Sequence, residues 1–154
     1  MPGRIEARLK ELNIELPAAT APIANYVPFV VTGNLVFISG QVSLAGTEKH
    51  LGKVGQELSV EQGNAAARCC ALSILAHLKA ACRGDLDRVQ RCVKLNGFVN
   101  SGPAFHDHPK VINGASDLIV AVFGDAGRHA RVALGAPALP LNFAVEVDAV
   151  FEIA

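Results

Sequence analysis

The sequence predicts an α+β domain in which one mixed β-sheet carries two helices on the same face. Three observations support this fold class. The chain has 154 residues, a length typical of one domain, so residues 1–154 are expected to fold as a single unit. Strand-like and helix-like patterns follow each other in the order ββ-α-β-α-ββ, after one helix at the N-terminus. Two helices cannot cover both faces of such a sheet, so its other face needs another cover.

The N-terminal third begins with a helix and a hairpin. Residues 2–13 are predicted to form a short amphipathic helix, with Pro2 near its start and an apolar face made by Ile5, Leu9 and Leu12. Two apolar, β-branched runs at 26–31 and 35–40 flank turn residues, which predicts a hairpin. Residues 44–58 contain three glycines and most of the local charge, so we expect an exposed loop there.

A long helix is predicted over residues 59–83. Ser59 and Gln62 have the spacing of a capping box, and Gly84 supplies a left-handed stop. The pattern then predicts a strand at 88–100, a helix at about 109–123, and strands at about 130–135 and 143–153. The stretch that joins the last two strands contains a glycine and two prolines, which favours a connection over strand pairing.

The composition indicates a folded chain with more apolar surface than a small monomer can bury. Hydrophobic residues make up 51% of the chain and charged residues 18%, which excludes disorder. Burial against other copies of the chain explains this balance best. The longest apolar runs are far shorter than the ~20 residues that span a bilayer. The N-terminus lacks the apolar core of a signal peptide, so we expect no membrane association and a cytoplasmic location.

The charge pattern argues against nucleic acid as a partner. The chain has 14 basic and 14 acidic residues, no Trp and one Tyr. Proteins that bind nucleic acids usually carry a basic stripe, often with stacking aromatic residues. Neither feature is present in this sequence.

The cysteines and histidines do not predict a metal site. The four cysteines form no C-x-x-C pair, so buried, reduced thiols are favoured over metal binding or disulfides. His106 and His108 lie two residues apart without a third ligand nearby, which favours a polar loop. No phosphate-binding or dinucleotide-binding motif occurs, so we expect neither a cofactor nor a metal.

Two single charges inside apolar segments are the candidate functional residues. Arg131 either extends to solvent from the start of a strand or lies at a cleft, where its planar fork could bind a carboxylate. Alternation along the last strand places Glu146 with Ala144, Asp148, Val150 and Glu152, opposite Phe143, Val145, Val147, Ala149 and Phe151. That face is either solvated, or it holds Glu146 half-buried and able to transfer protons. Periodicity alone leaves both pairs of alternatives open.

Two segments resemble the signatures of one known family. "YVPFVVTGNLVFISGQ" (26–41) resembles the N-terminal signature of the RidA/YjgF family, in which a Tyr precedes a hairpin that ends in Ser-Gly-Gln. "HARVALGAPALPLNFAVEVDAVFEI" (129–153) resembles its C-terminal signature of an Arg, an apolar run, Leu-Pro and a strand with a Glu. The helix and strand predicted between these segments have the expected order. The resemblance covers about residues 17–154.

The resemblance implies a chorismate-mutase-like fold and a homotrimer with clefts between its subunits. It also implies hydrolysis of reactive enamines and imines, such as 2-aminoacrylate, to 2-keto acids and ammonia, without a cofactor or metal. By matching position, Arg131 resembles the arginine that holds the substrate carboxylate, and Glu146 the acid that positions water. The remaining matches, which line the pocket in the family, are Tyr26, Ser39, Gly40 and Asn113. His129, two residues before Arg131, is either a neighbour of the site or merely exposed.

The chain also departs from the family pattern. Val132 and Ala133 stand where the family often has Ser-Cys, so no thiol is available beside the arginine. The charged loop at 44–58 and the N-terminal helix indicate a longer, divergent subgroup. The alternative to a deaminase is a catalytically silent trimer of the same fold that binds small carboxylates and has a regulatory role. Ribonuclease activity is disfavoured by the zero net charge and the single Tyr.

Overall fold

The computed structural model describes residues 3–21 and 24–154, so the predicted role of Pro2 lies outside the described residues. The elements are α1 (Arg4–Glu11), β1 (Phe29–Thr32), β2 (Leu35–Val42), β3 (Leu44–Ala45), β4 (Glu48–Lys49), α2 (Val60–Ala81), η1 (Leu86–Arg88), β5 (Val89–Asn100), α3 (His108–Phe123), η2 (Gly124–Gly127), β6 (Ala130–Ala136), η3 (Pro140–Asn142) and β7 (Val145–Ile153), where η marks a short 3-10 helix. The predicted helices and the main strands are all present, within a few residues of the predicted bounds.

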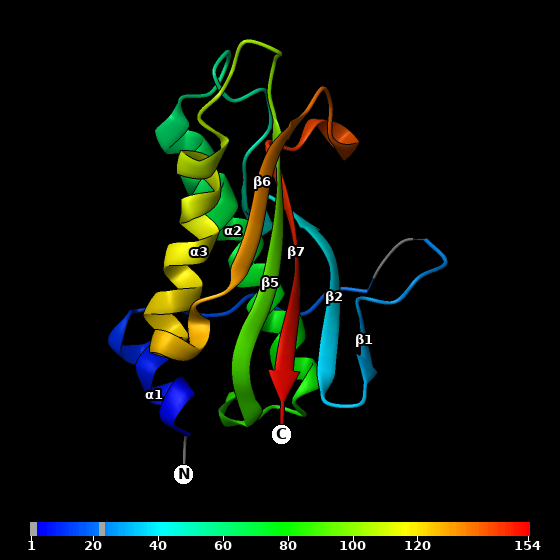
Figure 1. Ribbon diagram of the computed structural model, residues 1–154, viewed down its shortest axis with the longest axis vertical. Coiled ribbons are helices and arrows are strands. Elements are labelled where there is room, and N and C mark those ends of the chain that lie inside the picture. Colours follow the sequence, from blue (N-terminus) through cyan, green and yellow to red (C-terminus); the bar gives the residue numbers. More distant parts are fainter. Residues whose placement is uncertain (1–2, 22–23) are drawn as a thin grey trace.

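One five-stranded sheet in the order β1-β2-β7-β5-β6 forms the centre of the molecule (Figure 1). The pair β5–β6 is parallel and the other pairs are antiparallel, so the sheet is mixed, as predicted. The two long helices α2 and α3 pack on the same face of it, and α1 lies beside α3 (Figure 1). The α+β prediction is therefore confirmed. A sheet covered in this way has one face left open.

The core lies between the sheet and the two long helices. Along β7, Val145, Val147, Ala149, Phe151 and Ile153 are buried and alternate with half-buried residues, which confirms the predicted alternation within the strand. Burial of these side chains against α2 and α3 is the main force that holds the helices on the sheet.

The start of α1 is capped from a distant part of the chain. The carboxylate of Asp87 accepts hydrogen bonds from the backbone N–H groups of Arg4 and Ile5.

The ends of α2 follow the predicted signals. Ser59 Oγ accepts from the Gln62 N–H at 3.1 Å, and the Ser59 N–H donates to Gln62 Oε1 at 2.8 Å, which completes the capping box. At the other end Gly84 has a φ of +89° and its N–H donates to the Lys79 carbonyl at 2.8 Å. The left-handed position of this closure is taken by Arg83, with a φ of +56°, one residue before the predicted glycine, and Gly84 follows it.

A close approach between α2 and α3 sets the position of α3. A Cβ atom at Gly114 would lie 2.0 Å from the Asn64 carbonyl oxygen, so only glycine fits there. The Asn64 side chain also donates to the Lys110 carbonyl at 3.0 Å. These contacts fix the helix face that carries Asn113 and Ser116.

The expectation of an exposed loop at 44–58 is confirmed for exposure, since most of these residues are exposed, but it is wrong in part about the loop. Residues in this segment form the β3–β4 hairpin, and Val54 is fully buried. The Val54 N–H donates at 2.8 Å to the carbonyl of Asn100, the last residue of β5. The glycine and charge content indicated a loop, but a distant strand supplies hydrogen-bond partners that no local pattern shows.

Three strand bounds also differ from the predictions. Pairing in the first hairpin begins at Phe29, so Tyr26 precedes the sheet. Gly135 and Ala136 belong to β6, because the parallel neighbour β5 pairs with them. Ala144 precedes β7 and is completely buried, so it does not share the face of Glu146.

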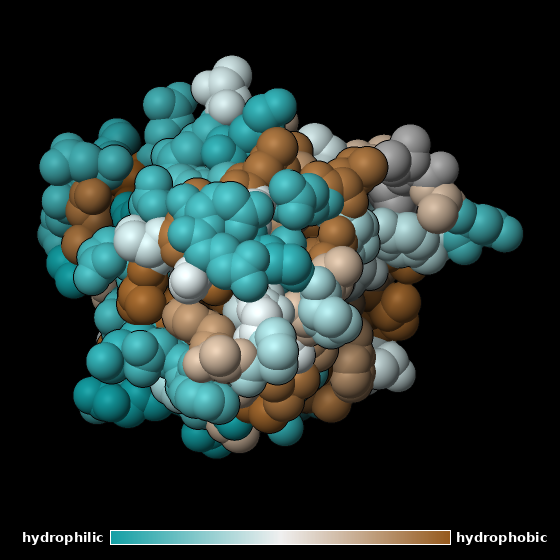
Figure 2. All heavy atoms as spheres, turned by 90° about the horizontal axis from the view of Figure 1, so that it is seen from above, coloured by the Kyte–Doolittle hydropathy of each residue, from teal (hydrophilic) through white to brown (hydrophobic). Residues whose placement is uncertain are grey.

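The open face of the sheet exposes several large apolar side chains. Val30, Phe37, Val132 and Leu134 are each between 38% and 51% exposed. Register places Val30 opposite Phe37 and Phe37 opposite Val150, so these residues form a row across β1, β2 and β7. In the view from above, hydrophobic residues reach the surface between hydrophilic ones (Figure 2). Exposed apolar groups of this kind are typical of interaction surfaces.

No helix in the described part of the chain is long and apolar enough to cross a membrane.

Candidate functional site

The six predicted site residues fall into two groups, each built by neighbouring elements. Arg131 and Asn113 come from β6 and α3, and the structure brings them together. Gly40 and Glu146 come from β2 and β7 and are also in contact. Ser39 lies next to Gly40, and Tyr26 lies in the segment before β1.

Arg131 is held by two neutral oxygen atoms on α3. Its Nη1 donates to Asn113 Oδ1 at 2.8 Å and to Ser116 Oγ at 3.2 Å. Asn113 and Ser116 are three residues apart, so they lie on one face of the helix. Arg131 pairs with Leu95 on β5, which is buried in the core. Because paired residues of neighbouring strands point to the same face, the Arg131 side chain lies on the side of the sheet that the helices cover.

A chain of hydrogen bonds continues from Arg131 through Ser116 to His129. Ser116 Oγ lies 2.8 Å from His129 Nε2, and His129 Nδ1 lies 2.6 Å from the Gly127 carbonyl oxygen. The carbonyl only accepts, so Nδ1 of the neutral ring carries the proton, and Nε2 accepts from the Ser116 hydroxyl. Ser116 then accepts from Arg131. The alternative that His129 neighbours the site agrees with this chain, whereas Ser116 had no signal in the sequence.

The guanidinium group of Arg131 carries a charge without a matching anion. Among residues 3–21 and 24–154, no carboxylate forms an ion pair with it. Its two hydrogen-bond acceptors are both reached through Nη1, so Nε and Nη2 remain directed elsewhere. These two atoms form the side of a guanidinium that binds both oxygens of a carboxylate. Chemically, this arrangement can bind an anion.

Glu146 lies against a bulge in the neighbouring strand. The register of β2 with β7 shifts between Ile38 and Gln41, so Ser39 and Gly40 form the irregular step. A Cβ atom at Gly40 would lie 2.6 Å from Glu146 Oε2 and 3.1 Å from its Cδ. The carboxylate thus occupies the space of a side chain at Gly40, and a larger residue there would force the Glu146 side chain to move.

Burial raises the pKa of the Glu146 carboxyl above its ordinary value, and the negative charge of Asp148 raises it further. Asp148 itself accepts a hydrogen bond from Asn96 at 2.7 Å. In the described part of the chain, no hydrogen bond or ion pair engages the Glu146 carboxylate. A carboxylate with a raised pKa and open lone pairs can accept a proton from water and return it.

Ser39 ties the segment that carries Tyr26 to the bulge. Ser39 Oγ donates to the Val27 carbonyl at 2.7 Å, and the Ser39 N–H donates to the Pro28 carbonyl at 2.9 Å. The Ser39 hydroxyl proton is thus used within the protein. Tyr26 is 55% exposed, so its ring is not part of the core.

The two groups do not meet within one chain. Glu146 lies between the buried Val145 and Val147, so it points to the open face of the sheet. Arg131 points to the helix side, and β5 separates β6 from β7. One chain therefore holds Arg131 on the edge strand β6, on the helix side, and Glu146 on the central strand β7, on the open face.

The two residues after Arg131, Val132 and Ala133, stand where the family often has Ser-Cys, and the structure shows their surroundings. Val132 is 38% exposed on the open face, and Ala133 packs partly against the core on the side of Arg131. No described cysteine lies beside the arginine, since all four are buried in α2, its C-terminal end or β5. His106 is exposed, and His108 begins α3 next to Phe105, so the pair does not share a metal site with a third described ligand.

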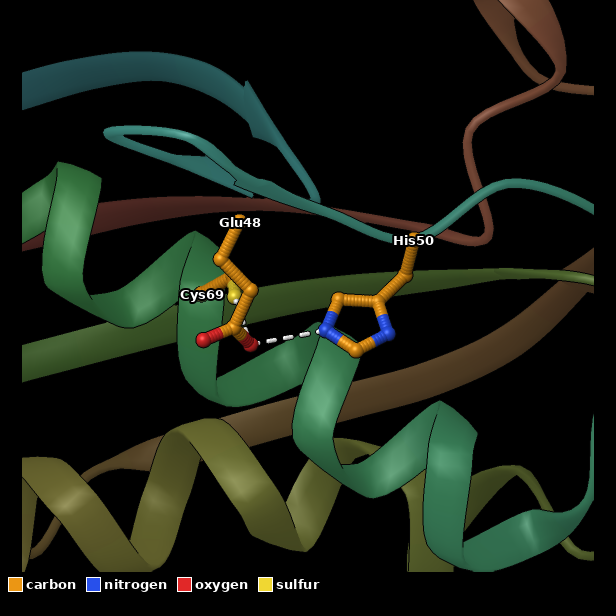
Figure 3. A group of neighbouring side chains, drawn as sticks. All are labelled: Glu48, His50 and Cys69. Atoms are coloured by element: carbon orange, nitrogen blue, oxygen red, sulfur yellow. Dashed lines mark hydrogen bonds and ion pairs between the residues drawn. The ribbon is translucent and has the colours of Figure 1, made fainter.

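A cluster that sequence reasoning missed does combine three metal-binding side chains. Glu48, His50 and Cys69 come together between the β3–β4 hairpin and α2 (Figure 3). The spacing of Glu48 and His50 places them on one side of a strand, but Cys69 has no such signal.

Comparison with known proteins assigns the chain to a family. The model of the family described as "YjgF/chorismate_mutase-like, putative endoribonuclease" matches residues 6–153, nearly the whole chain. The chain belongs to the YjgF family. The chorismate-mutase-like fold expected from the two signatures is thereby confirmed, with a mixed sheet and helices on one face.

Three relatives show how this YjgF-family chain compares with others. It is 51% identical to Protein TCP17 of Trypanosoma cruzi over 98% of this chain and 95% of that protein. It is 50% identical to Atu1372 of Agrobacterium tumefaciens, a protein of unknown function, with a TM-score of 0.91 over 97% and 92% of the two chains. A protein of Shewanella oneidensis described as a "putative endoribonuclease" is 37% identical, with a TM-score of 0.92 over 98% and 100%.

The contact between Gly40 and Glu146 leads to a prediction about stability. The change Gly40→Ala should lower the free energy of unfolding by about 0.5–1.5 kcal/mol, because the new methyl group forces the Glu146 side chain out of its rotamer. In a Glu146→Ala background the same change should cost much less. Urea denaturation of the four proteins in this double-mutant cycle measures the coupling. Equal costs in both backgrounds would show that the overlap is relieved elsewhere.

Proposed function

We propose that this protein hydrolyses small 2-imino acids and their enamine forms to 2-keto acids and ammonia, at sites formed between copies of the chain. The observation that carries the proposal is the Arg131 guanidinium, which is held through Nη1 and has no carboxylate partner among the described residues. A 2-imino acid supplies that partner as its own carboxylate. Membership of the YjgF family and the matching signatures add support.

Arg131 would orient the substrate through its carboxylate. Two parallel hydrogen bonds from Nε and Nη2 fix both the position and the plane of the carboxylate, which a lysine cannot do. Asn113 and Ser116 hold the arginine in one rotamer, so binding costs little side-chain entropy. The imine carbon, attached directly to the carboxylate, is then held at a defined distance from the site.

Glu146 would act on the attacking water. Its ionised carboxylate accepts one proton while the water oxygen bonds to the imine carbon, and the C=N double bond becomes a single bond. The nitrogen takes one proton from solvent, and the protonated carboxyl returns its own proton to the same nitrogen. As the C–N bond then breaks, ammonia leaves and the proton of the added hydroxyl group passes to solvent, which forms the C=O bond. The sum is one imine and one water converted to one keto acid and one ammonia. No metal or cofactor is required for the balance.

A second copy of the chain would bring the two groups together. Arg131 lies on the edge strand β6, whereas Glu146 lies on the central strand β7, and Gly40 and the Tyr26 segment lie beyond it toward the β1 edge. If the open faces pack around a common axis, the edge strand β6 of one subunit meets the β1–β2 hairpin of the next. The exposed Phe37 and Leu134 on that face support such an assembly, and we propose a homotrimer.

The activity is tested by competition for an imino acid. A pyridoxal-phosphate enzyme generates 2-aminoacrylate in the presence of semicarbazide, and this protein should divert the intermediate from semicarbazone to keto acid. Arg131→Ala and Glu146→Gln should each lower kcat/KM by roughly 10²-fold or more. Arg128→Ala, which removes an exposed arginine three residues away, should retain full activity.

The outcomes separate the two functions that the residues allow. No diversion of any imino acid would exclude the deaminase. In that case, isothermal titration should be used to measure binding of a 2-keto acid. If the wild type bound it and Arg131→Ala did not, the site would be that of a silent carboxylate-binding regulator.

The environment of Glu146 predicts a pH dependence. Water activation needs the ionised carboxylate, so kcat/KM should fall as the pH drops through the pKa of Glu146, which burial and the Asp148 charge raise. The change Asp148→Asn removes the neighbouring charge and should shift this acid limb to lower pH. Glu152→Gln, farther along the same strand, should leave the limb in place. An unchanged limb in Asp148→Asn would assign it to a different group.

The assembly has its own prediction. Light scattering should give a mass of three chains for the wild type. Leu134→Glu should break the assembly and remove deaminase activity, because it places a charge on the open apolar face. Ala80→Glu, on the outer surface of α2, should leave both unchanged. A monomeric wild type that is fully active would contradict the proposed shared site.

A further inference from the structure

The β3–β4 hairpin carries two side chains that converge on α2. Glu48 lies on β4, His50 follows that strand, and Cys69 lies on the helix below them (Figure 3). The candidate ligand atoms of these three residues all lie within 4.8 Å of one another. This cluster is on the helix side of the protein and takes no part in the proposed deamination.

The geometry of the cluster is closely defined. His50 Nε2 lies 2.8 Å from Glu48 Oε2, and Cys69 Sγ donates to the same oxygen at 2.9 Å. Cys69 is 1% exposed, His50 is half-buried and Glu48 is exposed, so the cluster is open to solvent on one side only. A small ion can enter from that side.

The backbone holds His50 in place from two directions. Its N–H donates to the Ser43 carbonyl at 3.0 Å, and its carbonyl accepts from the Ala144 N–H at 3.0 Å and from Ser43 Oγ at 2.8 Å. These bonds join the hairpin to the start of β7. The imidazole is thus presented to α2 by a rigid framework, which favours a site over a chance contact.

A cysteine nucleophile does not fit this arrangement. The Cys69 thiol donates to a carboxylate and not to the histidine, so no base withdraws its proton toward a thiolate. Burial, followed by the bond to Glu48 and its charge, raises the pKa of Cys69 to about 12. The protonated thiol needs a cation to become a strong ligand.

We propose that Glu48, His50 and Cys69 form a binding site for one zinc ion, with water as the fourth ligand. Sulfur, imidazole nitrogen and carboxylate oxygen are the three ligand types that Zn²⁺ takes in proteins, and three protein ligands leave one position open. On binding, the Sγ–H bond breaks, an Sγ–Zn bond forms and the proton passes to solvent. The thiolate and the carboxylate then balance the charge of the ion.

The neighbouring charges are compatible with this site. The positive charge of Arg68 acts on Glu48 and Cys69 and would repel a bound cation. Arg68 is exposed, however, so solvent screens this repulsion. The ligands come from elements that meet only in the folded chain, so the ion should stabilise the folded state. It would fasten the β3–β4 hairpin to α2 without reaching Glu146, which points to the other face of the sheet.

Cobalt and zinc titrations of the full chain test the proposal. Protein reduced with a phosphine and freed of metal should bind one Co²⁺ per chain, with a thiolate-to-cobalt charge-transfer band that Zn²⁺ abolishes by displacement. Zn²⁺ should also raise the Tm of the wild type. The change Cys69→Ser should remove the band and weaken Zn²⁺ binding at least about tenfold, the smallest loss that even an outer partner of a metal ligand causes.

Matched variants show whether these residues are the ligands. Cys82→Ser changes another buried cysteine at the end of the same helix and should keep the band. If Cys69→Ser does not fold, His50→Gln on the hairpin carries the test and should lose the rise in Tm with Zn²⁺. A wild type that binds no Co²⁺, or a band that survives Cys69→Ser, would overturn the site whether or not the deaminase assay succeeds.

Discussion

The side chains of β7 alternate between a face that α2 and α3 cover and a face that they leave open, and this constraint decides where each charged group lies. Val145 and Val147 enter the core, so Glu146 between them must face outward. The same period on β6 turns Arg131 toward α3. One chain thus places Arg131, which forms no ion pair within residues 3–21 and 24–154, and the half-buried carboxylate of Glu146 on opposite faces of its sheet.

Small residues at close contacts keep both groups in position. Gly114 lets α3 approach α2, and the helix face next to it carries the two oxygens that hold Arg131. Gly40 leaves the space in which the Glu146 carboxylate lies. In each case a Cβ atom would overlap a neighbouring atom. The close packing that glycine allows therefore helps to set the position of a candidate functional side chain.

Local patterns predicted elements well where the signal was local. The capping box at Ser59, the stop near Gly84 and the two-residue period of the last strand depend on neighbours in sequence, and each agrees with the structure. The prediction of a loop at 44–58 failed in part, because this segment has partners far away in the sequence. Val54 forms a hydrogen bond with β5, and the β3–β4 hairpin contacts α2. For the same reason Ser116 and the cluster of Glu48, His50 and Cys69 had no sequence signal: their members are brought together only by packing.

The sequence by itself determined the fold class, the family and the identity of the two charged residues, because periodicity, caps and ordered signatures are properties of neighbouring residues. Only the tertiary structure decided which face each charge occupies. It placed Arg131 on Asn113 and Ser116, set Glu146 over Gly40, and left the apolar face of the sheet open. Strand order and helix placement are set by burial of the whole core, and burial depends on contacts between residues far apart in the chain.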